Sequence, residues 1–101
     1  MILRVWQFRP HPDRLSEFRS VYGPNGPWAL LFAQSSGFFG TELARSTLDP
    51  NLYLTIDRWD EASSWELFRR THSNEYEALN KQCEELTLEE TEIGTFRSPA
   101  H

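Results

Sequence analysis

The sequence has little of what several protein classes require. Its 101 residues include one cysteine, Cys83, which excludes a disulfide within the chain. No apolar run reaches transmembrane length, no basic stretch is present, and the formal net charge is −5. The N-terminus also lacks a basic segment followed by an apolar one, as a signal peptide would have. We therefore expect a soluble, cytoplasmic protein with no nucleic-acid and no membrane partner.

Motifs that hold metals, phosphates or cofactors are missing as well. His11, His72 and His101 have no metal-ligand spacing, and Cys83 lies in an apolar stripe typical of a buried residue. The glycines occur in turn-like clusters rather than in a phosphate-binding loop. The sequence predicts no metal and no cofactor.

Aromatic side chains, in contrast, are plentiful. Four tryptophans, three tyrosines and seven phenylalanines make up 14% of the chain. A small domain can use such residues in its core, in a dimer interface or in a pocket for a flat ligand.

Hydrophobic periodicity and turn residues predict four strands and two helical regions. The strands are expected at residues 2–9, 38–47, 52–59 and 87–96. Helices are expected at residues 13–22, from Pro27 to the Ser35-Ser36-Gly37 break, at 61–71, and onward from Ser73. Asp60 and Ser73 are the predicted N-caps of the last two segments.

The order of these elements is β-α-β-β-α-β, which predicts an α+β, ferredoxin-like fold with a four-stranded antiparallel sheet. We expect one domain over residues 1–97 and a short tail over residues 98–101. The first strand has Trp6 and Phe8 on one side and Leu3 and Val5 on the other. A sheet that is apolar on both faces needs a second cover. The pattern therefore predicts a homodimer in which two sheets pack face to face.

Several segments resemble the antibiotic biosynthesis monooxygenase (ABM) family. They are Tyr53-Leu-Thr-Ile-Asp-Arg-Trp59-Asp60, Trp65-x-x-Phe68, His72-Ser-x-Glu75-Tyr76 and Gly37-Phe-Phe-Gly-Thr-Glu-Leu43. The resemblance covers residues 2–97. It implies a dimeric α+β barrel and a choice among cofactor-independent monooxygenases, haem-degrading enzymes and uncharacterised small proteins.

The resemblance transfers to this chain residue by residue. Trp59 matches a pocket tryptophan at the end of the third strand in quinone-forming members, and Trp65 matches a nearby pocket aromatic in type. Thr55 stands where those members have an asparagine, which is a departure from their pattern. Haem-degrading members need a tryptophan and a histidine on the long helix; Phe68 and Ala78 stand at those places, so haem degradation is not expected.

The candidate catalytic residue is His72. A cofactor-free oxygenase must deprotonate a phenol-like substrate, and a histidine titrates near neutral pH. The alternative is that His72 only packs at the end of its helix. Candidate substrate-binding residues are Trp6, Thr55, Trp59, Trp65, Phe68 and Tyr76, whose alternative role is to fill the core.

The adjacent pair Asp57 and Arg58 also has two interpretations. These residues could hold a polar group of the substrate, or pair with charges on a neighbouring strand.

Two functions follow from these candidates. The first is a cofactor-independent ABM-type monooxygenase acting on an electron-rich, phenol- or quinone-like aromatic. The second is a non-catalytic dimer of the same fold that binds a small aromatic ligand or assists another protein. Fold alone does not choose between them.

Overall fold

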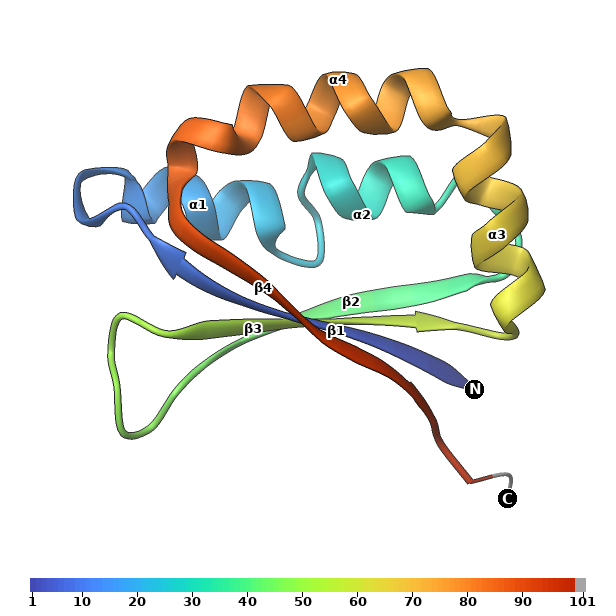
Figure 1. Ribbon diagram of the computed structural model, residues 1–101, viewed down its shortest axis with the longest axis horizontal. Helices are drawn as coiled ribbons and strands as arrows, with labels where there is room; N and C mark the ends of the chain where they lie inside the picture. The colour runs from blue at the N-terminus through green and yellow to red at the C-terminus, as the bar shows by residue number, and fades with distance from the viewer. Residues whose placement is uncertain (100–101) are drawn as a thin grey trace.

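A single antiparallel sheet forms the base of the molecule, and all of the α-helices cover one of its faces (Figure 1). The computed structural model describes residues 1–99. The strands are β1 (Ile2–Pro10), β2 (Phe38–Arg45), β3 (Tyr53–Trp59) and β4 (Thr87–Arg97), in the order β2-β3-β1-β4. The helices are α1 (Leu15–Tyr22), α2 (Pro27–Phe32), α3 (Ala62–Thr71) and α4 (Ser73–Cys83), with 3-10 turns at Pro12–Arg14 and Glu84–Leu86. The predicted α+β, ferredoxin-like fold is confirmed.

The two central strands, β1 and β3, alternate between a buried and a half-buried face. On β3 the buried residues are Tyr53, Thr55, Asp57 and Trp59, whereas the residues between them are half-buried. This period of two places every second side chain beneath the helices. The core is therefore a layer between the sheet and α1, α2, α3 and α4, and it is largely aromatic.

Two predicted helix caps are wrong. Glu61, not Asp60, is the N-cap of α3; the Asp60 carboxylate instead accepts a hydrogen bond from the Glu61 backbone N–H at 2.6 Å. Ser73 is the first residue of α4, and His72 is its N-cap without a side-chain bond. Asp60 and Ser73 are of residue types that cap helices, but the N-cap of each helix is the neighbouring residue.

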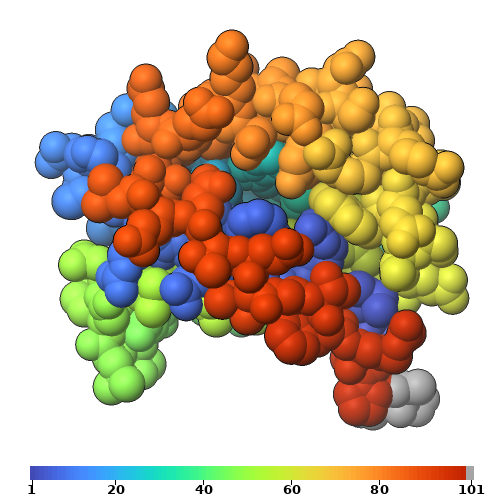
Figure 2. Space-filling model, in the orientation of Figure 1, coloured from blue at the N-terminus to red at the C-terminus, as the bar shows by residue number. Residues whose placement is uncertain are grey.

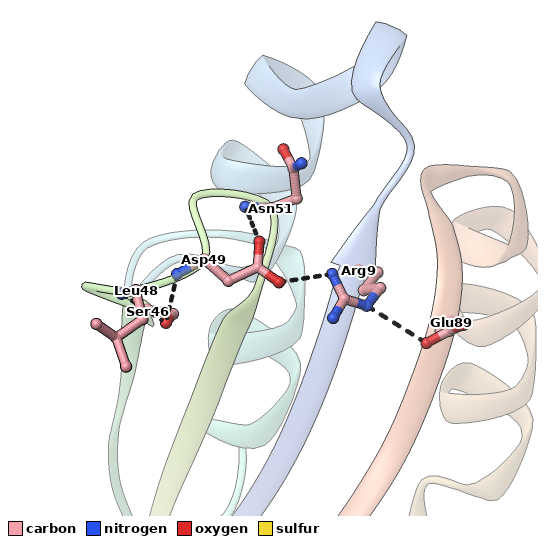
Figure 3. Close-up of polar contacts among 6 residues, drawn as sticks. All are labelled: Arg9, Ser46, Leu48, Asp49, Asn51 and Glu89. Atoms are coloured by element: carbon pink, nitrogen blue, oxygen red, sulfur yellow. Dashed lines mark hydrogen bonds and ion pairs between the residues drawn. The ribbon is translucent and has the colours of Figure 1, made fainter.

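Strand β2 ends two residues earlier than predicted because a serine turns the chain. The Ser46 hydroxyl accepts the backbone N–H groups of Leu48 and Asp49, at 3.1 and 3.0 Å (Figure 3). The Asp49 carboxylate then binds Arg9 of β1 at 2.9 Å, and Arg9 also faces Glu89 of β4 at 3.6 Å (Figure 3). The β2–β3 loop is thus tied to the sheet, and it projects on the side away from the helices (Figure 1).

The sheet face opposite the helices is apolar at its centre. Val5 of β1 lies directly opposite Ile56 of β3, and Leu3 lies opposite Phe96 of β4. Nothing in residues 1–99 covers these side chains; Val5 and Ile56 are half-buried, and Phe96 is 49% exposed.

The acidic side chains of the last strand are at the surface. Glu89, Glu90 and Glu92 are all exposed on β4. Strand β4 ends at Arg97. The domain boundary at residue 97 stays a prediction, and residues 100–101 of the predicted tail lie outside the described residues.

None of the helices within residues 1–99 combines the length and the apolar character needed to cross a bilayer.

Candidate active site

A cavity lies between the sheet and the helices α2 and α4. Its volume is about 60 Å³. The space-filling view shows a hollow between α4 and β4, at the bottom of which atoms of β1 and α2 are visible (Figure 2). A cavity needs roughly 10–15 Å³ to hold one water, and one of about 150 Å³ holds benzene, so this cavity has room for a few waters and is smaller than one aromatic ring.

Aromatic side chains make up half of the residues that line the cavity. Trp28 and Phe32 come from α2, and Tyr76 comes from α4. The rings of Trp28 and Tyr76 meet edge to face, with centroids 5.1 Å apart. The aromatic lining residues are Trp6, Phe8, Tyr22, Trp28, Phe32 and Tyr76. A flat apolar ligand is the class that such a wall suits.

The sheet contributes polar groups to the floor of the cavity, and Asp57 is one of them. Asp57 is 6% exposed and its carboxylate accepts a hydrogen bond from the Thr41 hydroxyl at 2.7 Å. Burial raises the pKa of Asp57 to about 6, although the Thr41 hydrogen bond and the charge of Arg4 act in the opposite direction. An acid with such a pKa is a base poised near neutral pH. The polar lining residues are Arg4, Thr41, Thr55, Asp57, Asn80 and Glu90.

Arg4 is the cation of the floor, directly opposite Asp57 in the β1–β3 pairing. Its guanidinium lies 3.6 Å from the centroid of the Trp65 ring, an arrangement that lets a cation remain in an apolar setting. Glu92 of β4 is 3.7 Å away from it. Burial lowers the pKa of Arg4, and the charges of Tyr76, Asp57 and Glu92 oppose that change; an arginine stays protonated in any case.

Tyr76 adds a hydroxyl group to the α4 side of the cavity. Burial raises the pKa of its phenol, while the charges of Arg4 and Arg69 act to lower it. The Arg69 guanidinium lies 3.9 Å from the Tyr76 ring centroid and forms a 2.8 Å ion pair with Glu77. Tyr76 is thus a neutral hydrogen-bond donor near neutral pH.

The structure divides the predicted substrate-binding residues into two groups. Trp6, Thr55 and Tyr76 line the cavity. Trp59 and Phe68 are 0% and 2% exposed and pack within the core, outside the cavity wall.

Trp65 lies between the two groups. Its ring packs on that of Trp59, with centroids 5.5 Å apart, and it supports Arg4 from behind. Trp65 therefore lies behind the cavity wall, in contact with the lining residues Arg4, Phe32 and Tyr76.

The structure places His72 at the junction of α3 and α4. Its Nδ1 is 2.7 Å from a Glu75 carboxylate oxygen, and its ring stacks on Phe68 with centroids 5.1 Å apart. Its backbone continues the helical path, because its N–H donates to Phe68 and its carbonyl accepts from Tyr76. His72 is outside the residues that line the cavity.

Sequence reasoning did not pick out Arg4 and Asp57 as a pair. A signal was available: both are charged residues at inward positions of strands whose other inward positions are mostly apolar. Of the two residues paired in the sequence analysis, Arg58 points outward and binds Glu42 of β2 at 3.0 Å. Asp57 points inward, and its hydrogen-bond partner on β2 is the neutral Thr41.

Metal ligands do not gather around this cavity. Within residues 1–99, no three side chains of the histidine, cysteine, aspartate and glutamate types are grouped so that they could hold a metal ion.

The fold and the cavity define a ferredoxin-like α+β domain with an aromatic pocket and a buried acid at its floor. Residues 1–82 match the sequence pattern of the antibiotic biosynthesis monooxygenase family, so the chain belongs to that family. The resemblance found in the sequence is confirmed. Comparison with curated proteins returned no match.

Solved structures of low sequence identity share the fold. An asparagine-to-alanine variant of SnoaB, a cofactor-independent oxygenase from Streptomyces nogalater, is 22% identical, with a TM-score of 0.75 over 99% of this chain and 94% of that one. Rv0793 from Mycobacterium tuberculosis is 18% identical, with a TM-score of 0.68 over 99% and 96%. A conserved protein from Methanosarcina mazei is 17% identical, with a TM-score of 0.69 over 98% and 94%.

Proposed function

We propose that this chain is a monooxygenase that oxidises a flat, electron-rich aromatic compound bound in the cavity between the sheet and helices α2 and α4. The observation that carries the proposal is Asp57, a buried carboxylate with a pKa of about 6 at the floor of an aromatic pocket. Burial of an acid in this way is costly, and it is common where a base must act near neutral pH. Membership of the ABM family supports the same reaction class.

The reaction begins with a proton transfer. The Asp57 carboxylate takes a proton from a phenol- or anthrone-like substrate, and the resulting anion is electron-rich enough to reduce O₂. For a substrate methylene, the ring–CH₂ becomes ring–C=O, one oxygen atom enters the product and the other leaves as water. The four electrons come from the substrate, so this chemistry needs no metal or flavin; SnoaB is described as cofactor-independent.

Each cavity residue has a role in this proposal. Trp6 and Thr55 shape the sheet side of the pocket, and Tyr76 donates a hydrogen bond from α4. The enclosed volume is smaller than one ring, so most of an aromatic substrate lies in the hollow between α4 and β4 (Figure 2). Trp59, Trp65 and Phe68 form the packed wall that holds this floor in place.

His72 is the second candidate for the base. Its Nδ1 already contacts Glu75 at 2.7 Å, and its ring stacks on Phe68 and does not line the cavity. We therefore assign the proton transfer to Asp57 and use His72 as the comparison.

Oxygen uptake with anthrone-type substrates tests the proposal. Asp57→Asn keeps the acceptor for Thr41 but removes the base, and we expect the turnover rate to fall by roughly 10²–10⁴-fold. His72→Gln is expected to retain most of the activity. A loss confined to His72→Gln would move the base to the helix junction, and no oxygen uptake by the wild type with any electron-rich aromatic would exclude the oxygenase.

A second function, a non-catalytic binding protein, is favoured by one observation. Trp59 and Trp65 pack against each other and the cavity is small, about 60 Å³. A protein of this kind would bind small phenols tightly without consuming oxygen. Calorimetric binding combined with an oxygen electrode separates the two functions.

The expected homodimer belongs to the proposal as well. Its support is the apolar sheet face that includes Leu3, Val5, Ile56 and Phe96, with no helix on that side among the described residues. A second copy of the chain is the partner whose face has the same chemistry. The cytoplasmic location stays a prediction.

A further inference from the structure

Arg4 has hydrogen-bonding capacity that the protein does not use. The residue is 9% exposed and lies in the wall of the cavity. Within residues 1–99 its guanidinium forms no hydrogen bond, and its ionic contact with Glu92, at 3.7 Å, is longer than a hydrogen bond. A guanidinium has five N–H donors in a planar fork.

The Arg4 side chain is mostly buried, and its free donors open onto the cavity, where a ligand can bind them. Trp65 supports the flat face of the guanidinium and leaves the N–H groups at its rim free for other partners. Such donors bind carboxylates, phosphates and other oxyanions well. The position of Arg4 beside Asp57 indicates which of these anions the cavity can accept.

We propose that Arg4 holds the oxyanion of the ligand, so that the cavity takes a phenol as its phenolate while Asp57 carries the proton that the phenol has lost. The proposal rests on the proposed function, because it uses the same cavity, the same ligand class and the same proton transfer to Asp57. In this exchange the O–H bond of the phenol breaks and an O–H bond forms on the Asp57 carboxylate. No electron is transferred, and the total charge in the cavity stays the same.

Charge conservation is what favours a phenol over a ligand that arrives as an anion. A carboxylate or a phosphate would meet Asp57 in its ionised form, as well as Glu90 at the cavity wall and Glu92 beside Arg4. A phenol enters neutral and ionises only as Asp57 becomes neutral. The negative charge near Arg4 then moves from Asp57 to the phenolate.

Other charged and titratable groups face Arg4 from the remaining elements. Tyr76 on α4 is a neutral donor that can share the oxyanion, and Arg69 on α3 adds a second positive charge at longer range. Both favour the phenolate, whereas Glu92 on β4 opposes it. Because Glu92 is exposed, its charge is screened by solvent more strongly than that of Arg69 or Asp57.

The test uses 4-nitrophenol, whose phenolate form absorbs visible light, and nitrobenzene, which has the same ring without the hydroxyl. In wild type we expect bound 4-nitrophenol to ionise at a lower pH than the free compound. In Arg4→Gln this shift should disappear, and the affinity near neutral pH should fall roughly 10- to 100-fold. Nitrobenzene should bind both proteins equally, which shows that the cavity of the variant is intact.

Two further variants complete the design. Asp57→Asn should bind preformed phenolate severalfold more tightly than wild type, because a neighbouring negative charge has been removed. Arg70→Gln, an exposed arginine on α3, should leave both affinities unchanged.

Three outcomes would overturn the proposal. They are equal binding of the phenolate by Arg4→Gln and wild type, an equal loss of nitrobenzene binding in Arg4→Gln, and no binding of either probe by wild type. Failure of the proposed function is separate: phenolate binding that depends on Arg4, without oxygen uptake for any substrate, would exclude the oxygenase and still support the role of Arg4.

Discussion

Asp57 is an acid in a largely apolar setting, and its cost to stability depends on pH. Its pKa rises from an ordinary value of 3.8 to about 6 on folding. The folded state therefore holds the proton between these two values, where the unfolded state has lost it. The free energy of unfolding falls as the pH rises through this window and stays lower above about pH 6.

Asp57→Asn removes this penalty while an amide oxygen still accepts the Thr41 hydrogen bond. We expect the variant to be more stable than wild type by about 1–3 kcal/mol above about pH 7, and equally stable near about pH 4. Urea unfolding at a series of pH values measures the difference. Asp13→Asn, at an exposed site, is the matched control and should show no such dependence. A difference that does not change with pH would contradict the assigned titration.

Trp59 shows that an aromatic residue at a family pocket position can serve the core. It is 0% exposed and touches Phe32, Phe38, Trp65 and Phe68 at centroid distances of 5.2–5.7 Å. Trp59→Ala should cost roughly 3–5 kcal/mol of unfolding free energy, because it leaves a large cavity. The control, Leu48→Ala at a site that is 95% exposed, should change the stability little. A stable Trp59→Ala protein with altered phenol binding would instead make Trp59 a pocket residue.

At the scale of the elements, residues that end strands or form turns made most of the fold predictable from the sequence. Pro10 and Pro12 mark the end of the first strand, and Asp49-Pro50 marks the hairpin. The cap predicted at Asp60 was wrong because its carboxylate binds the backbone N–H of Glu61, one residue before α3 begins. The residue type suits a cap, but its position does not.

The candidate site could be predicted only in part, for a physical reason. Strand alternation indicates that Thr55, Asp57 and Trp59 share a face, and this is how they lie. Whether an aromatic residue on that face fills space or encloses it depends on the opposing helices. That information lies in contacts between distant segments, such as Trp59 with Phe32 of α2.

One close contact between elements offers a test of the packing around the site. Gly37 precedes β2 and lies against the start of α3: a Cβ there would be 2.5 Å from Asp60 Oδ1 and 2.5 Å from Ser64 Cβ. Gly37→Ala must push α3 away from the sheet, and we expect a loss of about 1–3 kcal/mol. Ser36→Ala, the exposed neighbour, is the control, with an expected change within about 0.5 kcal/mol. Equal melting temperatures for the two variants would show that α3 is free to shift.

At the scale of the whole molecule, the uncovered face of the sheet is the surface on which the proposed homodimer depends. Four strands of 7 to 11 residues form this face. With a rise of about 3.3 Å per residue and a strand spacing of about 4.8 Å, the flat area of the sheet is roughly 500 Å². This area does not include the additional surface of the side chains. Typical interfaces bury about 800 Å² per partner. The side chains of the face and the projecting β2–β3 loop add to the flat area, so the area buried per partner in a face-to-face pair would approach that value.

Ile56→Lys tests this assembly by placing a charge at the centre of the face, opposite Val5. We expect wild type to scatter light as twice the 11.9 kDa chain at micromolar concentration, and the variant as a single chain with an unchanged far-UV spectrum. A buried, unpaired lysine is costly in the dimer but harmless where water reaches it. Leu67→Lys, on α3 at a site that is 57% exposed, should leave the dimer intact. A monomeric wild type would mean that the apolar face has another cover, and the two-sheet assembly would then be wrong.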